Sequence, residues 1–381
     1  MKPTRSPWED EEHEMLRDGV ARYIESEFVP ELERWIGQGT VDREAWNKAG
    51  EAGLLCASVP EEYGGPGGTY AHEAVIIEEM EYAGIGLNFA TVVHNTIVAH
   101  YILVYGTEEQ KLRWLPKMVT GEIVGAIAMT EPGTGSDLQA VKATAEKDGD
   151  DWIINGQKTF ISNGQLCDLV IVVCKTSRDK GAKGISLLVV ECDSDGFSRG
   201  QKLSKIGVKA SDTSEIFFDN VRVPASNLLG EEGKGFVQLM QQLPQERLGL
   251  SVQAVAAMER AIALTSDYVK ERKVFGAPLL SLQNTRFVLA ECKTEATIAR
   301  IFIDECIQRH MRGELDNETV AMSKWWCTER QNVIVSKCLQ LFGGYGYSTE
   351  YPISRMFTDA RVQMIYGGAN EVMKEIIGRG I

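Results

Sequence analysis

Glu246 is one of the carboxylates of this sequence that could do acid–base chemistry. It lies in the segment Pro244-Gln245-Glu246-Arg247-Leu248, and a carboxylate within hydrogen-bond reach of a weakly acidic carbon can remove its proton. Burial beside an apolar substrate would raise the pKa of this carboxyl to a value useful for a base. Pro244 disfavours helical geometry at Leu243, which predicts a bend that points Glu246 into a cleft. The alternative is an ordinary glutamate near a helix N-terminus, stabilised by the helix dipole.

Residues 128–137 have the composition of a ligand-binding loop. They read Ala-Met-Thr-Glu-Pro-Gly-Thr-Gly-Ser-Asp and follow an expected strand. Their glycines, hydroxyls and free backbone donors suit contact with a polar ring or a phosphate. The segment is not a P-loop, because the Gly-Lys-Ser/Thr ending is absent, and residues 230–235 also lack the hydroxyl.

Arg272 is a candidate for binding a diphosphate, because a planar guanidinium can donate two parallel hydrogen bonds. Taken alone, it is better interpreted as a solvated charge at a helix end. The five histidines form no His-Glu-x-x-His pattern, and we interpret His94 and His100 as structural. The eight cysteines have neither a Cys-x-x-Cys pair nor zinc-type spacing, so we expect reduced, mostly buried thiols and no metal site.

The elements that must position these residues fall into three sections. Residues 7–119 have helical periodicity, interrupted by a glycine-rich loop at 60–68. Residues 123–223 change to patterns of short strands, with hairpin signals at Asp148-Gly149 and Asn155-Gly156. Helical periodicity returns after Asn227. We therefore expect an α+β multidomain chain: helical residues 1–122, a β-barrel or sandwich at 123–226, and a helical domain at 227–381.

The C-terminal section has the clearest helices. One apolar stripe follows spacings of three and four, and we expect further helices at 283–311 and 317–341. Residues 343–346, Gly-Gly-Tyr-Gly, separate the second of these helices from the rest of the C-terminal section. The stripe consists of Leu248, Val252, Val255, Met258 and Ile262.

Composition narrows the class of protein. The 381 residues carry a formal net charge of −14, which argues against sequence-independent nucleic-acid binding. The longest apolar run, residues 169–174, is far too short to span a bilayer, so no integral membrane segment is expected. Residues 1–14 are acidic and polar, where a signal peptide would need a basic start and an apolar core. A cytoplasmic enzyme is the expectation.

Residues 128–137 and 155–164 together resemble the acyl-CoA dehydrogenases, and the resemblance extends over nearly the whole chain. Loop 60–68, residues 271–276 (Glu-Arg-Lys-Val-Phe-Gly), residues 340–346 and Tyr366-Gly367-Gly368 follow in the family's order. Tyr351-Pro352-Ile353 and Asp359-Ala360-Arg361 complete its usual C-terminal run. The resemblance implies the family's fold: an N-terminal helical domain, a middle β-domain and a C-terminal domain like a four-helix bundle.

The resemblance implies FAD as the cofactor. Thr130 would bond the pyrimidine side of the flavin, Phe160 would keep an aromatic plane where the family usually has Trp, and Ser162 would lie near the flavin N5. Arg272 and Phe275 match positions that hold the diphosphate and adenosine across a subunit boundary, which implies a homotetramer. The full implied cofactor set is Met129, Thr130, Gly135, Phe160, Ile161, Ser162, Arg272, Phe275, Gln283, Gln340, Leu341, Gly343, Gly344, Ala369 and Glu371.

The resemblance further implies α,β-dehydrogenation of an acyl-CoA thioester to the trans-2-enoyl-CoA, with electrons passed to an electron-transfer flavoprotein. Most of the family carries the catalytic Glu where this chain has Gly367. Residues 244–248, however, match the segment from which long-chain and isovaleryl-CoA dehydrogenases supply the base. Glu246 is therefore the expected base, while Gly367 keeps the backbone donor for the enolate oxygen. The implied substrate-side residues are Ser136, Arg247, Tyr366 and Gly368.

Within the family, the long-chain subgroup is nearest, although Ala369 replaces its usual Thr and removes a hydroxyl expected near FAD. Two alternatives stay open at this point. One is a flavin oxidase or monooxygenase on the same fold, which would need access of dioxygen to reduced flavin. The other is a catalytically silent acyl-CoA-binding protein, against which the presence of Glu246 argues.

Overall fold

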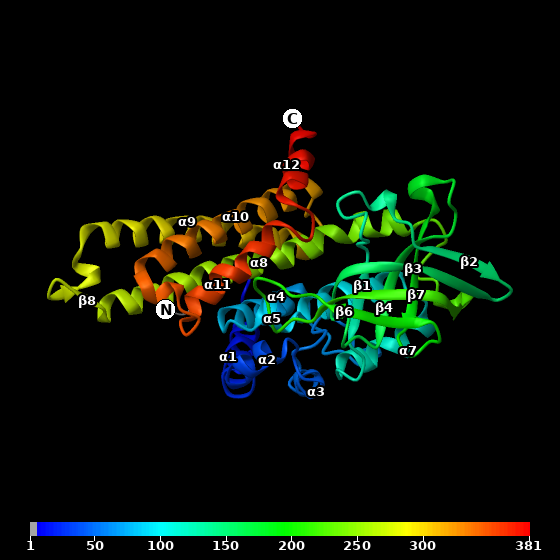
Figure 1. Ribbon diagram of the computed structural model, residues 1–381, viewed down its shortest axis with the longest axis horizontal. Helices are drawn as coiled ribbons and strands as arrows, with labels where there is room; N and C mark the ends of the chain where they lie inside the picture. The colour runs from blue at the N-terminus through cyan, green and yellow to red at the C-terminus, as the bar shows by residue number, and fades with distance from the viewer. Residues whose placement is uncertain (1–5) are drawn as a thin grey trace.

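The computed structural model of the protein describes residues 6–381 (Figure 1). The first five residues of the acidic segment 1–14 lie outside the described part. Asp10, Thr69 and Thr107 accept hydrogen bonds from backbone N–H groups and fix where three helices begin. The helices of the first section are α1 (Glu11–Glu27), α2 (Leu32–Gln38), α3 (Arg43–Glu51), α4 (Tyr70–Tyr82), α5 (Gly86–Phe89), α6 (His100–Tyr105) and α7 (Glu108–Val119).

A π-helix, Val93–Ala99, connects α5 to α6. Helical turns of this kind are rare and are often found at functional sites. The π-helix lies against the first strand of the sheet on one side and against the long helix α8 (Gly235–Glu271) on another. It therefore stands where the three sections of the chain meet.

The middle section forms a seven-stranded sheet in the order β1-β4-β2-β3-β7-β6, with β5 also paired to β4. Both faces of β4 are buried: Leu169 and Ile171 join the core under the N-terminal helices, while Val170 and Val172 join a separate core inside the sheet. The strands are β1 (Gly125–Ala128), β2 (Thr144–Asp148), β3 (Asp151–Ser162), β4 (Leu169–Lys175), β5 (Ile185–Glu191), β6 (Phe197–Lys202) and β7 (Thr213–Pro224).

Of the two expected hairpins, one is confirmed and one is wrong. β2 and β3 form an antiparallel pair that closes at Asp148 and Asp151, and Gly149 in the turn has φ +62°. Asn155-Gly156 instead lies inside β3, at a shift of register against β7. Gly156 has φ +154°, and a Cβ there would collide with Ala143, so this glycine permits a bulge and a close approach. β3 and β7 each have 12 residues and are not short.

The last section consists of three long helices that pack side by side, and the expected limits of the second and third agree with the structure to within a residue. They are α8, α9 (Gln283–Met311) and α10 (Asn317–Phe342), followed by α11 (Pro352–Ala360) and α12 (Asn370–Gly378). The predicted apolar stripe from Leu248 to Ile262 is buried in their common core. By length and composition α8 could cross a membrane, but 83% of its qualifying 18-residue window is buried inside the fold.

The expected loss of helical geometry at Leu243 is wrong, because α8 runs through Pro244 without interruption. Glu246 consequently stands well inside a helix, and the alternative of a glutamate at a helix N-terminus is also wrong. α8 has 37 residues, and at about 1.5 Å per residue it is roughly 55 Å long. Figure 1 shows that it extends from the sheet to the small hairpin of β8 (Lys273–Val274) and β9 (Ala277–Pro278) at the opposite end of the molecule.

Candidate active site

Glu246 lies on the face of α8 that packs against α6 and is 6% exposed. The hydroxyl of Tyr101 donates a 2.8 Å hydrogen bond to its Oε1. Burial raises the pKa of Glu246 to about 7, while the hydrogen bond from Tyr101 and the charge of Arg247 act in the opposite direction. A buried carboxyl that titrates near neutral pH has the properties of a general base.

The turn at Gly367-Gly368 is held against α8 and α10 by two basic side chains that donate to its carbonyl groups. Nε of Arg247 donates to the Gly367 carbonyl at 3.4 Å, and Nζ of Lys324 donates to the Gly368 carbonyl at 2.6 Å. Lys324 is fully buried and also donates to Oδ1 of Asn370 at 3.0 Å. Burial and the neighbouring Arg247 lower the pKa of Lys324 to about 7. The turn is thus fixed in an electropositive environment that suits a developing oxyanion.

Glycine is required at both positions of this turn. The φ angles of Gly367 and Gly368 are +61° and +95°, in the region that L side chains rarely adopt. A Cβ at Gly367 would overlap Cδ1 of Leu250, and one at Gly368 would press on Met373. A carboxylate side chain at Gly367 would therefore be strained by the positive φ and would have to displace Leu250, whereas Glu246 lies one helical turn before Leu250 on α8.

The loop at residues 128–137 is anchored to β3 by a buried ion pair. Nζ of Lys158 donates to Oε1 of Glu131 and to the Met129 carbonyl, both at 3.0 Å, and to the Val173 carbonyl at 2.7 Å. The Thr130 carbonyl accepts a 2.9 Å hydrogen bond from Thr159. Sequence analysis did not identify Lys158, although its fully buried ammonium fixes Met129 and Thr130 in place.

The residues next to Thr130 fit a planar ring such as a flavin. β3 bulges between Lys158 and Ile161, and Phe160 in the bulge has φ +58° and is 66% exposed. A bulge of this kind redirects a side chain, and here it presents an aromatic ring on the surface. Throughout residues 6–381, no protein group bonds to the hydroxyls of Thr130 and Ser162, so both are available to a ligand. Gly135 and Ser136 lie in the exposed continuation of the loop.

A second set of the implied cofactor residues gathers at the other end of α8. Arg272 follows the last residue of this helix and stacks over the ring of Tyr345 at 5.3 Å. Phe275 projects from the β8–β9 hairpin with φ +49° and is 100% exposed. No carboxylate of the described chain pairs with Arg272, which leaves its guanidinium free for a diphosphate. This end also contains Gln283, Gln340, Leu341, Gly343 and Gly344.

The two sets lie on different parts of the fold: Thr130 follows β1 and Phe160 lies in β3, whereas Arg272 lies at the end of α8 next to the β8–β9 hairpin (Figure 1). Ala369 and Glu371 belong to neither far end: they flank the start of α12, directly after the Gly367-Gly368 turn.

Two groups that were interpreted as structural do pack in that way. Nδ1 of His94 accepts from the backbone of Gly125 and Nε2 donates to the Met118 carbonyl, each at 3.0 Å, while burial lowers the histidine's pKa to about 4. The eight cysteines are all buried, as expected. Over residues 6–381, no group of three or more His, Cys, Asp or Glu side chains could hold a metal ion.

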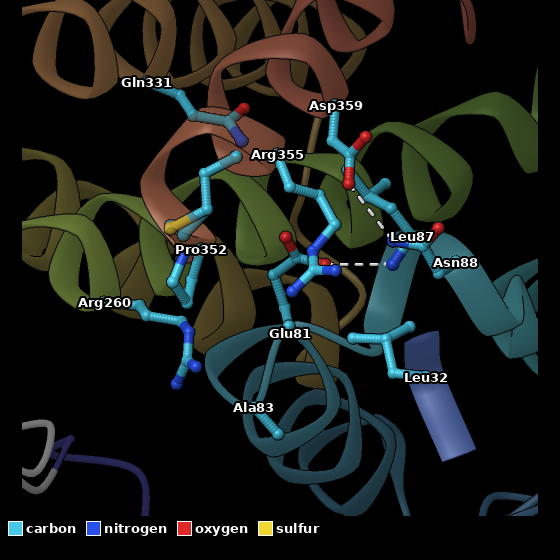
Figure 2. Close-up of a pocket in the computed structure, with 13 residues that line it drawn as sticks. Leu32, Glu81, Ala83, Leu87, Asn88, Arg260, Gln331, Pro352, Arg355 and Asp359 are labelled. Carbon is cyan, nitrogen blue, oxygen red and sulfur yellow. Dashed lines mark hydrogen bonds between the residues drawn. The ribbon is translucent and has the colours of Figure 1, made fainter. Parts of the chain in front are cut away.

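A small polar cavity lies behind the C-terminal loop, between α4, α5, α8 and α11 (Figure 2). Asp359 accepts from Nδ2 of Asn88 at 3.1 Å and from the backbone of Val208, and Asn88 accepts from Ala210 at 3.1 Å. Glu81 accepts from Leu87, and burial raises its pKa to about 8. These contacts fasten the β6–β7 loop to α5 and α11, so the Asp359-Ala360-Arg361 motif has a structural role in this fold.

Comparison with known proteins agrees with this architecture. The N-terminal, middle and C-terminal domains of acyl-CoA dehydrogenase match residues 10–122, 126–221 and 233–381. The mitochondrial long-chain specific acyl-CoA dehydrogenase of Sus scrofa is 49% identical over 373 residues, which are 97% of this chain and 86% of that protein. The crystal structure of an acyl-CoA dehydrogenase from Geobacillus kaustophilus has a TM-score of 0.96 and 48% identity, with 99% of both chains covered.

A glutaryl-CoA dehydrogenase from Mycobacterium smegmatis, solved in complex with FADH2, has a TM-score of 0.91 and 28% identity over 98% of this chain and 95% of that one. The resemblance seen in the sequence and the three-part fold that it implied are both confirmed. The chain belongs to the FAD-dependent acyl-CoA dehydrogenase family and is an oxidoreductase that acts on the CH–CH bond of an acyl-CoA thioester.

Proposed function

We propose that this enzyme oxidises long-chain acyl-CoA thioesters to trans-2-enoyl-CoA, with Glu246 as the catalytic base. The observation that carries the proposal is the position of this buried carboxyl, which lies on α8 next to Arg247, the residue that holds the Gly367 carbonyl. The preference for long chains rests on the similarity to long-chain specific relatives at 48–49% identity.

The residues of the chain divide the reaction between them. Glu246 removes the α-proton of the thioester, and its pKa near 7 makes it a base of suitable strength. The backbone N–H of Gly367 stabilises the enolate oxygen, in a turn that Arg247 and Lys324 hold by its carbonyls. The chemistry that FAD supplies when bound is acceptance of hydride from the β-carbon. Tyr101 holds the carboxylate of Glu246 in one orientation.

The cofactor site is proposed to be completed in a homotetramer. Thr130, Phe160 and Ser162 of one chain would hold the ring, and Arg272 and Phe275 of a second chain would hold the diphosphate and adenosine. Support comes from the separation of these two sets along α8 and from the full exposure of Phe275. α9 also exposes Phe287, Ile298 and Ile301, a row of apolar side chains that suits burial between subunits.

Anaerobic bleaching of the flavin by a panel of acyl-CoA thioesters tests the reaction. Wild-type protein should bleach fastest with long chains, whereas Glu246→Gln should keep FAD and lose bleaching by several orders of magnitude. Glu305→Gln, at a partly exposed glutamate of α9 that pairs with Arg309, is the matched control and should bleach like wild type. Normal bleaching by Glu246→Gln would refute the base assignment. Reoxidation of the reduced enzyme by electron-transfer flavoprotein, compared with air, then tests the proposed acceptor.

A further inference from the structure

α8 and the helical segment before α7 pack against each other in opposite directions and form a seam beside the base. Glu246 meets Tyr101, and Nε2 of Gln245 donates to the Thr96 carbonyl at 2.8 Å. Gly249 lies three residues beyond Glu246, on the same side of α8. It faces Thr96 of the π-helix and Val92, the residue directly before the π-helix. An acyl chain whose α-carbon lies at Glu246 would follow this seam.

Gly249 leaves a gap in the seam. A Cβ at this position would lie 3.5 Å from Cγ1 of Val92, 3.8 Å from the hydroxyl oxygen of Tyr70 and 3.9 Å from Oγ1 of Thr96. These are ordinary contact distances, so the gap accommodates a group of one non-hydrogen atom without strain. Two of the three atoms around it are oxygens.

The hydroxyl of Tyr70 is the unusual member of this site. Tyr70 is 7% exposed, and its hydroxyl oxygen is fully buried without a hydrogen-bond partner in the part of the chain that the structure describes. A buried hydroxyl without a partner is unfavourable, so the position calls for a ligand atom. Oγ1 of Thr96 donates to the Val92 carbonyl at 2.9 Å and keeps its lone pairs free. The gap therefore offers one donor, from Tyr70, and one acceptor, from Thr96.

We propose that the gap beside Gly249 is a subsite for a hydroxyl group carried by the acyl chain, and hence that hydroxylated acyl-CoA thioesters are substrates of this enzyme. The inference rests on the proposed function and specifies its substrate class. A hydroxyl would accept from Tyr70 and donate to Thr96, whereas a methyl branch would leave Tyr70 without a partner. Three residues of α8 correspond to about 4.5 Å, which places the substituent several carbons beyond the β-carbon, between δ and ζ.

The test uses pairs of acyl-CoA thioesters of equal length, one unsubstituted and one with a hydroxyl at the δ, ε or ζ carbon. The ratio of their kcat/KM values is measured on the FAD-loaded enzyme for wild type, Tyr70→Phe and Gly249→Ala. We expect wild type to turn over at least one hydroxylated thioester as well as its partner. Tyr70→Phe should lower the ratio roughly three- to tenfold, the contribution of one neutral hydrogen bond, with the unsubstituted substrate unaffected. Gly249→Ala should lower it too, because its methyl group fills the gap.

An unchanged kcat/KM ratio in both variants would overturn the subsite. Failure of the wild-type enzyme to turn over any hydroxylated thioester would overturn it too. Either result would mean that only water hydrogen-bonds to Tyr70. Both outcomes leave turnover of the unsubstituted chain intact. Absence of turnover with either member of each pair would instead overturn the proposed function and the subsite with it. Protein-bound flavin absorbance and the melting temperature of each variant show whether the fold is retained.

Discussion

The hydroxyl of Tyr101 donates a 2.8 Å hydrogen bond to Oε1 of Glu246, which is 145 residues away in the sequence. The bond stabilises the ionised carboxylate, and it opposes the effect of burial on the pKa of Glu246. One side chain from the N-terminal helices thus tunes and orients a base on α8.

Tyr101→Phe should therefore move the pH dependence of kcat/KM to higher pH. Glu246 acts in its ionised form, so activity rises as pH increases through its pKa of about 7. Loss of the hydrogen bond raises that pKa, and we expect kcat/KM at neutral pH to fall roughly three- to tenfold and to recover at alkaline pH. Tyr105→Phe, whose hydroxyl bonds to Gln241 and Gln242 instead, is the control. A uniform loss at every pH would assign Tyr101 a merely structural role.

Returning the base to the C-terminal turn should fail in this chain. In the double variant Glu246→Gln, Gly367→Glu, the new side chain must adopt φ +61° and displace Leu250. A small misplacement of a base lowers the rate greatly, so kcat should stay at least roughly a hundredfold below wild type. Addition of Leu250→Ala removes the overlap and should recover part of the loss. Wild-type bleaching by the double variant would show that the turn tolerates a carboxylate.

How far the sequence predicts the structure depends on whether a feature is local. The limits of α9 and α10 follow from periodicity and from the glycines after α10, which act within a few residues. The hairpin predicted at Asn155-Gly156 was wrong because the same dipeptide suits both a hairpin turn and a β-bulge. Pro244 was expected to disfavour helical geometry at Leu243, but burial of the apolar stripe of α8 against two helices outweighs a local cost of about 3 kcal/mol.

The candidate site was predictable in part for the same reason. Glu246 and Gly367 could be paired only through resemblance, and the structure brings their neighbourhoods together through Arg247. Tyr101, Lys158 and Lys324 act through contacts with residues far away in the sequence. The spacing of residues along the chain does not predict such contacts. A lysine that is buried among helices resembles, in sequence, any other lysine on an amphipathic helix.

Ala369→Thr should stabilise the protein. Ala369 is the N-cap of α12, and no side chain there accepts a hydrogen bond from the first turn. A threonine hydroxyl can accept such a bond, and the gain is about 1 kcal/mol. We expect a higher melting temperature in differential scanning calorimetry, measured on FAD-depleted protein so that a change in cofactor binding does not contribute. Ala369→Val, which has the same shape without the hydroxyl, should show no gain.

Glu246→Gln should stabilise the folded protein above neutral pH. The folded pKa of Glu246, about 7, lies above its ordinary value of 4.5. Stability from the neutral carboxyl is therefore complete below pH 4.5 and is lost as pH rises through about 7. The neutral amide avoids this loss, and the gain at pH 8 should be on the order of 2 kcal/mol. Urea unfolding at pH 8 and at pH 5 measures it, and an equal gain at both pH values would contradict the cause.

Lys324→Met should impair catalysis by releasing the Gly367-Gly368 turn. Nζ of Lys324 is bonded to the Gly368 carbonyl, and loss of this bond frees the adjacent Gly367 N–H from its fixed direction. Removal of an oriented oxyanion donor lowers kcat roughly a hundredfold, and we expect kcat to fall more than KM rises because the contact matters most in the transition state. Lys337→Met, at a surface lysine of the same helix that pairs with Glu291, should leave both constants unchanged. If Lys324→Met raised KM alone, the lysine would contribute to substrate binding and not to the geometry of the turn.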